Sequence, residues 1–199
     1  HKEYRRQRQM CIRDSTYPDL KTNTNYTEIS KLIKQNNLVA IFQGRPEGGP
    51  RALGNRSLLF NAENSHAKEI VNKFKKREWY RPYAGSVLQD KVKSWFDLNG
   101  KKETPFMSYA TKVLNNKVPG ITHVDNTCRV QTVKQKDNYH FYKLLKEHHK
   151  QYSMPVMLNT SLNIAGKPIV ATFKQLMEMF HQTDLKYIYL PDKQHLIKK

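Results

Sequence analysis

The sequence has few cysteines and no long hydrophobic run, and both absences narrow the class of protein. Only two cysteines, Cys11 and Cys128, occur in 199 residues. They form neither a CxxC pair nor the dense, even set that is typical of disulfide-rich or zinc-binding domains. No stretch approaches about 18 consecutive apolar residues, and no charged start leads into an apolar run, so neither a membrane span nor a secretory signal is expected. We expect a cytoplasmic protein.

Acidic residues are also scarce. The chain has 17 Asp and Glu against 35 Lys and Arg, which gives a formal net charge of +18. Such an excess concentrates anions near the surface, and nucleic acid, phosphorylated metabolites and anionic membrane all qualify as partners. Lysines scattered over solvated helix faces would produce the same total, so the charge alone selects no partner.

The length and the composition favour one globular domain. Hydrophobic residues make up 38% of the 199 positions, which is enough for a sizeable core. The chain begins with His1 rather than Met, and its first fifteen residues show neither helical nor strand periodicity. We interpret residues 1–20 as a leader that is non-native or disordered, and residues 21–199 as the folded domain.

Helical and extended patterns alternate along residues 21–199, which predicts a single α/β domain with a mixed sheet flanked by helices. Four helices are expected, one capped by Thr27, one capped by Ser65, one over residues 138–152 and one capped by Thr172. A short helical turn is expected over 92–96. Extended segments are expected at 38–42, 58–60, 84–88, 106–109, 129–133, 155–158 and 185–190, the last being the final strand.

The densest chemical motif is GRPEGGPRALGNRS, residues 44–57, which directly follows an expected buried strand. Glycines let backbone N–H groups approach an anion closely, and guanidinium groups match phosphate or carboxylate oxygens in a bidentate way. Arg45, Arg51 and Arg56 supply those groups here. The order of residues is neither that of a P-loop nor that of a GxGxxG fingerprint. A tight surface loop with solvent-facing arginines is the alternative.

A second basic segment ends the expected helix that follows Ser65. Lys75 and Arg77 lie two residues apart, and Arg81 stands immediately before Pro82, which forces an extended exit towards the next strand. These three cations can therefore converge instead of fanning out. The alternative is a solvated basic helix end favoured by the helix dipole, and it applies most to Lys73 and Lys76.

Two further motifs carry polar groups near strand ends. Ser161 and Asn163 follow an expected strand, where a hydroxyl and an amide are well placed to bind a ligand in an α/β sheet. In HVDNTCR, Asp125 is a candidate for orienting a cation or a ribose hydroxyl, and Arg129 for contacting phosphate. His123 has no second ligand at metal-binding spacing, so no metal site is predicted in this chain, and Cys128 is interpreted as an ordinary buried residue.

Together and in this order, the four motifs resemble the C-terminal region of the O-carbamoyltransferase family that includes nodulation and antibiotic-tailoring enzymes. The resemblance runs from about residue 26 to residue 190 and rests on GPRALGNRS, KKRE with RPYAGSVL, HVDNTCRVQTV and LNTSLNIAGKPIV. It implies a YrdC-like domain that binds ATP and carbamoyl phosphate, with Mg²⁺ as helper, and forms a carbamoyl-adenylate. The family's N-terminal Kae1-like domain, which holds iron or another divalent metal, would then transfer the carbamoyl group to an acceptor hydroxyl, and it is absent from this chain.

The resemblance also implies roles for individual residues. Its lysine-x-arginine element falls on Lys75 and Arg77, and its serine-x-asparagine element falls on Ser161 and Asn163. The implied catalytic residues are Lys75, Arg77 and Arg51. The implied contacts to carbamoyl phosphate or to the ATP phosphates are Arg51, Arg56, Lys75, Arg77, Arg81, Arg129, Ser161 and Asn163.

Some positions depart from the family pattern. Pro46 and Gly48 replace the usual Met and Phe, Gly85 replaces a Pro, and Asn126 replaces a Gly. Asn tolerates left-handed backbone, so Asn126 is expected to preserve its turn. One alternative function stays open, because the fold and the +18 charge also suit a YrdC-type module that binds RNA or takes part in threonylcarbamoyl modification of tRNA.

Overall fold

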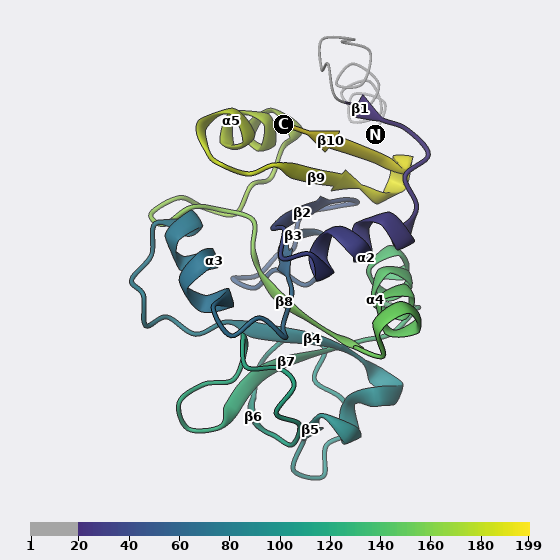
Figure 1. The fold of residues 1–199 in the computed structure, drawn as a ribbon, viewed down its shortest axis with the longest axis vertical. Coiled ribbons are helices and arrows are strands. Elements are labelled where there is room, and N and C mark those ends of the chain that lie inside the picture. The colour runs from purple at the N-terminus through teal and green to yellow at the C-terminus, as the bar shows by residue number, and fades with distance from the viewer. Residues whose placement is uncertain (1–19) are drawn as a thin grey trace.

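The computed structural model describes residues 20–199. The predicted leader at residues 1–20 therefore lies outside the described residues, apart from Leu20. That residue belongs to β1 (Leu20–Lys21), a two-residue strand that pairs with the last strand of the chain. The described domain thus brings both ends of residues 20–199 to the same margin of one sheet (Figure 1).

The described residues form one ten-stranded sheet. Strand β2 pairs in parallel with β9, and β4 pairs in parallel with β7, whereas the other neighbours are antiparallel. The sheet is therefore mixed, and the predicted fold class is confirmed. In spatial order the strands are β1, β10 (His195–Lys198), β9 (Tyr187–Leu190), β2 (Val39–Phe42), β3 (Arg56–Phe60), β8 (Val156–Ser161), β4 (Ala84–Leu88), β7 (Thr127–Val133), β6 (Ala110–Val113) and β5 (Phe96–Asp97).

Helices cover both faces of the sheet. Helices α2 (Tyr26–Lys34) and α4 (Tyr139–Tyr152) lie side by side on one face, and α3 (Ala67–Lys75) and α5 (Phe173–Gln182) lie on the other (Figure 1). Alternate strand residues divide between these layers, as the two-residue period of a strand requires. In β2, for example, Val39 and Ile41 pack in the core cluster under α2 and α4, and Ala40 packs in the cluster under α5.

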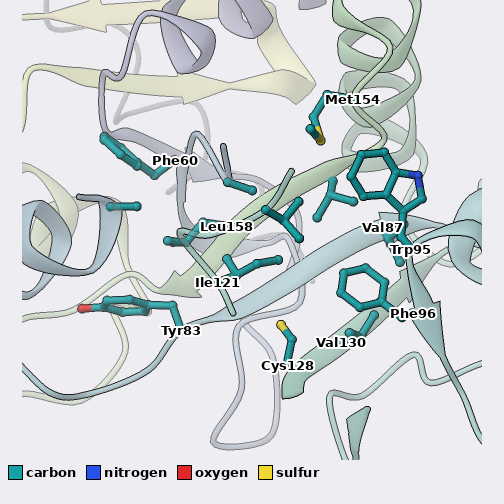
Figure 2. Packing of buried hydrophobic residues seen from close by; sticks show 14 of the residues in the cluster. Phe60, Tyr83, Val87, Trp95, Phe96, Ile121, Cys128, Val130, Met154 and Leu158 are labelled. Atoms are coloured by element: carbon teal, nitrogen blue, oxygen red, sulfur yellow. The ribbon is translucent and has the colours of Figure 1, made fainter. Parts of the chain in front are cut away.

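A separate apolar cluster supports the lower half of the sheet. It joins α3, β4 and β7 to the 3-10 helix η1 (Gln89–Ser94), and Figure 2 shows how its aromatic rings and aliphatic chains pack together. Cys128 is fully buried there, as predicted, and burial raises the pKa of its thiol to about 12. The labelled members are Phe60, Tyr83, Val87, Trp95, Phe96, Ile121, Cys128, Val130, Met154 and Leu158.

The helix ends correct two predictions. Helix α2 is capped by Asn25, whose Oδ1 accepts from the Glu28 N–H at 3.0 Å, so the prediction of Thr27 was wrong by two residues. Helix α3 begins after His66 without a side-chain cap, so the Ser65 cap was also wrong. The Thr172 cap is confirmed, because its hydroxyl accepts from the Gln175 N–H within a capping box.

Two of the expected strands and the expected helical turn also differ in part from the structure. Residues 106–109 form no strand, because Met107 has φ of +54° and turns the chain, and the strand follows as β6. The predicted final strand is followed by β10, which a 3-10 turn at Pro191–Lys193, η2, folds back against β9. The helical turn expected over 92–96 is present as η1, but it lies earlier in the chain, at Gln89–Ser94, and β5 begins at Phe96.

Gly54 offers a test of this packing. Its φ is +113°, and a Cβ there would lie 2.5 Å from Phe141 Cδ1 and 2.8 Å from Asn138 Nδ2. We expect Gly54→Ala to lower the free energy of unfolding by about 1–3 kcal/mol, because it combines backbone strain with overpacking. Urea denaturation measures the change. Gly48→Ala is the control, since a Cβ at Gly48 meets nothing within 4 Å; equal effects of the two substitutions would contradict the packing.

Candidate functional site

A cavity of about 390 Å³ opens beside the margin where β4 and β7 begin and β8 ends. Four arginines line it, Arg51, Arg77, Arg81 and Arg129. They come from three segments that are far apart in the sequence, and Ser161 at the end of β8 completes the polar lining. Within the part of the chain that the structure describes, no carboxylate lines this cavity. The lining is therefore a set of cations that includes no carboxylate, although Arg81 also pairs with Glu78, which lies outside the lining.

The arginines influence one another electrostatically. Burial and the neighbouring Arg51 guanidinium lower the pKa of Arg129. The Arg77 guanidinium acts on Tyr83, whose pKa burial raises to about 12 in spite of that nearby positive charge. Like charges gathered in this way repel each other, and an anion between them would remove the repulsion. The geometry thus favours binding of a multiply charged anion.

Lys75 lies behind the cavity wall, at the last position of α3. Its side chain is fully buried, and its Nζ donates to the backbone oxygen and to Oγ of Ser161, the latter at 3.1 Å. Asn163 Oδ1 accepts at 2.9 Å and Thr160 Oγ1 at 3.4 Å. Burial, and then the nearby Arg77, lower the pKa of Lys75 to about 6. The hydrogen-bond partners of Nζ are all neutral oxygens, and no carboxylate among them stabilises the charged form of the amine.

Ser161 and Asn163 form one unit with Lys75. Ser161 Oγ donates to Asn163 Oδ1 at 2.6 Å while it accepts from Lys75, and Asn163 Nδ2 donates to the Lys167 carbonyl at 2.7 Å. Ser161 lines the arginine cavity, whereas Asn163 lines a smaller neighbouring cavity of about 240 Å³. The structure therefore brings together seven of the eight predicted residues, five in the lining and two directly behind it.

Arg56 is the exception, and the structure corrects its expected position. It is the first residue of β3 rather than a loop residue, and it is 2% exposed. Its guanidinium lies 3.7 Å from the Phe42 ring centroid and donates to the carbonyls of Gln43, Gly44 and Ala171. It does not line the cavity. Its contacts are those of a residue that joins β2, β3 and the segment before α5.

The loop that presents Arg51 is held by an acidic residue that the sequence reasoning missed. Glu47 Oε1 accepts from the backbone N–H groups of Leu53, Asn55 and Arg56 at 2.9, 2.7 and 3.3 Å. One carboxylate thus replaces the backbone partners that a tight loop cannot supply. The glutamate is visible in the sequence inside the glycine-rich motif, but a carboxylate is not a residue type that one expects at an anion site.

A buried polar cluster supports the other side of the cavity. Asn159 Nδ2 donates to the Ala52 carbonyl at 3.2 Å, to Ser86 Oγ at 2.9 Å and to Gln131 Oε1 at 3.2 Å. Gln131 Nε2 in turn donates to the Leu53 carbonyl at 2.9 Å. The cluster connects β4, β7 and β8 to the loop that carries Arg51, so the four elements keep a fixed relation. These residues were missed because each is unremarkable alone, although strand alternation places them on one face.

The remaining predicted polar residues, Asp125, Asn126 and His123, stabilise their own turn or contact the chain next to it. Asp125 is exposed, and its Oδ1 accepts from the Thr127 N–H at 3.0 Å and from Thr127 Oγ1 at 2.7 Å. Asn126 has φ of +59°, so it preserves the turn as expected. His123 Nε2 lies 3.2 Å from the Tyr83 carbonyl. Across residues 20–199, no group of three or more His, Cys, Asp or Glu side chains is arranged to hold a metal ion.

None of the helices described in residues 20–199 is both long and apolar enough to span a membrane.

Comparison with known proteins gives the family. A model described as the carbamoyltransferase C-terminus matches residues 30–199. The chain belongs to this family. Two nodulation proteins are similar to this carbamoyltransferase C-terminus. NolO of Bradyrhizobium diazoefficiens is 41% identical over 148 residues, covering 72% of this chain and 27% of NolO. NolNO of Sinorhizobium fredii is 39% identical over 162 residues, covering 79% of this chain and 24% of NolNO. The chain thus spans about a quarter of these relatives.

Solved structures share the fold of this carbamoyltransferase C-terminus. Sua5 of P. abyssi, crystallised with L-threonine, gives a TM-score of 0.60 at 16% identity over 83% of this chain and 46% of Sua5. Full-length HypF in a phosphate- and nucleotide-bound form gives 0.57 at 19% identity over 86% of this chain and 24% of HypF. The YrdC-like fold predicted from the sequence is therefore confirmed.

Lys75 makes stability depend on pH. In the folded protein its pKa is about 6, against 10.5 for an ordinary lysine, so between these values the unfolded chain binds one more proton. The cost of burying the charge is full below about pH 6 and disappears as the pH rises towards 10.5, so this residue makes the free energy of unfolding rise with pH. Urea denaturation at pH 6 and pH 9 should show a smaller rise for Lys75→Met than for the wild type.

The control for that measurement is Lys73→Met, which changes an exposed lysine of the same helix. Its stability should follow the wild-type pH dependence. An unchanged pH dependence in Lys75→Met would contradict the low pKa of Lys75.

Proposed function

We propose that this chain is the substrate-activating part of an ATP-dependent O-carbamoyltransferase. It binds carbamoyl phosphate and ATP in the arginine cavity and produces a carbamoyl-adenylate. The observation that carries the proposal is the convergence of Arg51, Arg77, Arg81 and Arg129 in a lining without a carboxylate. Membership of the carbamoyltransferase family selects the carbamoyl group among the anions that such a cavity would accept.

The size and charge of the cavity suit two phosphorylated substrates. Its volume of about 390 Å³ lies within the range of small-molecule sites, about 300–1,000 Å³. Both substrates carry several negative charges at neutral pH, so bringing them together costs electrostatic energy that fixed guanidinium groups offset. Positioning and charge neutralisation are then the main tasks of the protein.

The proposed reaction balances as follows. Water cleaves carbamoyl phosphate to carbamate and inorganic phosphate. A carbamate oxygen then attacks the α-phosphorus of ATP, the bond from that phosphorus to the bridging oxygen breaks, and pyrophosphate leaves with the electron pair. The product is a mixed anhydride of carbamic acid and AMP. Its formation needs no general base from the protein, because carbamate is already an anion at neutral pH.

The predicted residues that line the cavity, and Lys75 behind it, each have a role in this scheme. Arg51 and Arg129, whose guanidinium groups interact, would bind one phosphoryl group together. Arg77 and Arg81, from the segment between α3 and β4, would bind the second. Ser161 would donate its hydroxyl proton to a substrate oxygen. Lys75 would gain a proton when an anion binds next to Ser161, because a nearby negative charge favours the ammonium form.

Mg²⁺ would be carried by the substrate rather than by the protein. Mg²⁺ prefers oxygen ligands and commonly binds one or two carboxylates together with phosphates. Among the described residues that line the cavity there is no carboxylate, so the phosphate oxygens of ATP would supply its ligands. Bound in that way, it would reduce the charge of the departing pyrophosphate.

Transfer of the activated carbamoyl group to a hydroxyl would take place elsewhere. The matched relatives are about four times as long as the matched segment, since it covers 24–27% of their length. We propose that a Kae1-like domain with a metal held by histidines performs that step, as the family resemblance implies. That domain would then determine which acceptor hydroxyl receives the carbamoyl group.

An RNA-directed function is the second candidate, and the net charge of +18 favours it. It requires tight RNA binding whose affinity falls steeply with salt, because each neutralised phosphate releases counter-ions. Filter binding of double-stranded RNA at low and physiological salt separates the two candidates. The family match favours carbamoyl transfer, since its model is the carbamoyltransferase C-terminus.

Exchange of labelled pyrophosphate into ATP tests the proposed function directly. The wild-type chain should catalyse exchange only when carbamoyl phosphate is present. Arg51→Ala should weaken it by about ten- to a hundredfold, the cost of losing a charged hydrogen bond. Arg45→Ala is the matched control from the same loop, because Arg45 is exposed and does not line the cavity. Exchange that does not depend on carbamoyl phosphate would contradict the proposal.

A further inference from the structure

The segment that carries Arg77 and Arg81 has almost no anchorage of its own. None of the side chains of residues 76–82 is buried, and Trp79 and Tyr80 are 79% and 64% exposed. The segment runs from the end of α3 to the start of β4 along the outside of the sheet (Figure 1). Its internal contacts are local, since Arg81 pairs with Glu78 at 2.6 Å and its N–H donates to the Glu78 carbonyl. Such contacts do not fix the segment relative to the cavity.

One buried side chain supplies the missing anchorage. Asn72 lies on α3 and is 1% exposed. Its Nδ2 donates to the carbonyls of Trp79 and Arg81, both at 3.1 Å. Its own backbone carbonyl accepts from the Arg77 N–H at 2.9 Å. Across the described residues, these are the hydrogen bonds that join Arg77, Trp79 and Arg81 through their backbone to the helix.

Tyr83 determines the orientation of the Asn72 amide. The Tyr83 hydroxyl donates to Asn72 Oδ1 at 2.6 Å, and Tyr83 is 2% exposed. Its ring packs in the apolar cluster while its hydroxyl points away from it (Figure 2). A flipped amide would set Oδ1 against two carbonyl oxygens, so the observed orientation is the one that satisfies every partner. The anchorage therefore extends from the core to the segment.

The charges of the cavity make such anchorage necessary. Arg77 and Arg81 share the lining with Arg51 and Arg129, and Lys75 lies behind it. Arg81 pairs with Glu78, but Glu78 belongs to the same exposed segment and does not tie that segment to the rest of the cavity. Mutual repulsion would drive an exposed segment outwards before an anion arrives. An amide resists this movement without adding a negative charge that would compete with the anion. A carboxylate at this position would instead repel the two carbonyls.

We propose that Asn72 is a positioning residue for anion binding: it holds the Arg77–Arg81 segment against the repulsion of the cavity cations, with Tyr83 fixing its amide. The proposal rests on the proposed function, since the anion is taken to be a phosphorylated substrate. The role is indirect, because Asn72 contacts the segment and not the substrate.

The test compares Asn72 with Asn61, a second buried asparagine whose side-chain amide also donates two hydrogen bonds. Asn72→Leu removes the proposed anchorage. Asn61→Leu is the matched control, because Asn61 Nδ2 donates to the Lys34 carbonyl and to Asn36 Oδ1 away from the cavity. Tyr83→Phe removes a single hydroxyl and keeps the ring in the core, so it tests the proposal even if Asn72→Leu fails to fold. Because that hydroxyl also interacts with Arg77, the motion of Trp79 in Tyr83→Phe reports the anchorage separately from the binding of the anion.

Binding of inorganic pyrophosphate to the full chain, measured by calorimetry, is the first measurement. We expect Asn72→Leu to weaken binding about tenfold or more, since small misplacements of charged groups are costly. Tyr83→Phe should give a smaller loss in the same direction, and Asn61→Leu should bind within about twofold of the wild type. Equal binding by Asn72→Leu, Tyr83→Phe and the wild type would overturn the proposal.

Fluorescence anisotropy of Trp79 is the second measurement and separates this inference from the proposed function. Trp79 is exposed and Trp95 is 7% exposed, so local motion of the segment alters mainly the signal of Trp79. Asn72→Leu should increase that motion, and saturating pyrophosphate should reduce it again. If the motion depends on Asn72 but exchange never requires carbamoyl phosphate, the proposed function fails and the anchorage stands. Unchanged motion in Asn72→Leu would refute the anchorage.

Discussion

The rest of the structure depends on one constraint, the mutual repulsion of four guanidinium groups that line a single cavity. Arg51, Arg77, Arg81 and Arg129 meet there without a carboxylate in the described lining, and Lys75 adds a buried amine behind it. An internal counter-ion would relieve the repulsion, but it would also occupy the place of an anionic substrate. The described lining holds no such carboxylate: Glu78 pairs with Arg81 from outside it, and backbone and neutral polar groups hold the segments that carry the other cations. The site is therefore ready for an anion before one binds.

The supporting groups around the cavity share a common feature. Glu47 uses one carboxylate oxygen on three backbone N–H groups of its own loop rather than on an arginine. Asn159 and Gln131 bind the carbonyls of the same loop from the sheet side. Ser161 and its neighbours hold Lys75 with uncharged oxygens, which is why burial lowers its pKa. These groups fix the geometry and place no negative charge in the cavity lining.

Much of the fold and of the site could be predicted from the sequence, because glycine, proline and apolar alternation limit where basic residues can lie. The expected loops do carry Arg51, Arg77, Arg81 and Arg129 to one place. Arg56 was misplaced because a polar residue at a strand start looks like a loop residue, and only its pairing with Phe42 shows otherwise. The Asn25 cap competes with Thr27 on equal local chemistry, so packing of α2 decides it. Short strands such as β1 and β10 carry too few residues to form a pattern, and the partners of Asn72 are set by tertiary contacts.

The family match and the cavity support the same conclusion from independent directions, since one rests on sequence similarity over residues 30–199 and the other on the charges of the described lining. The most direct test is a crystal structure of this chain grown with carbamoyl phosphate and a non-hydrolysable ATP analogue. We predict density for both phosphorylated molecules between Arg51, Arg77, Arg81 and Arg129. Density for either molecule at another surface, with this cavity empty, would contradict the central claim.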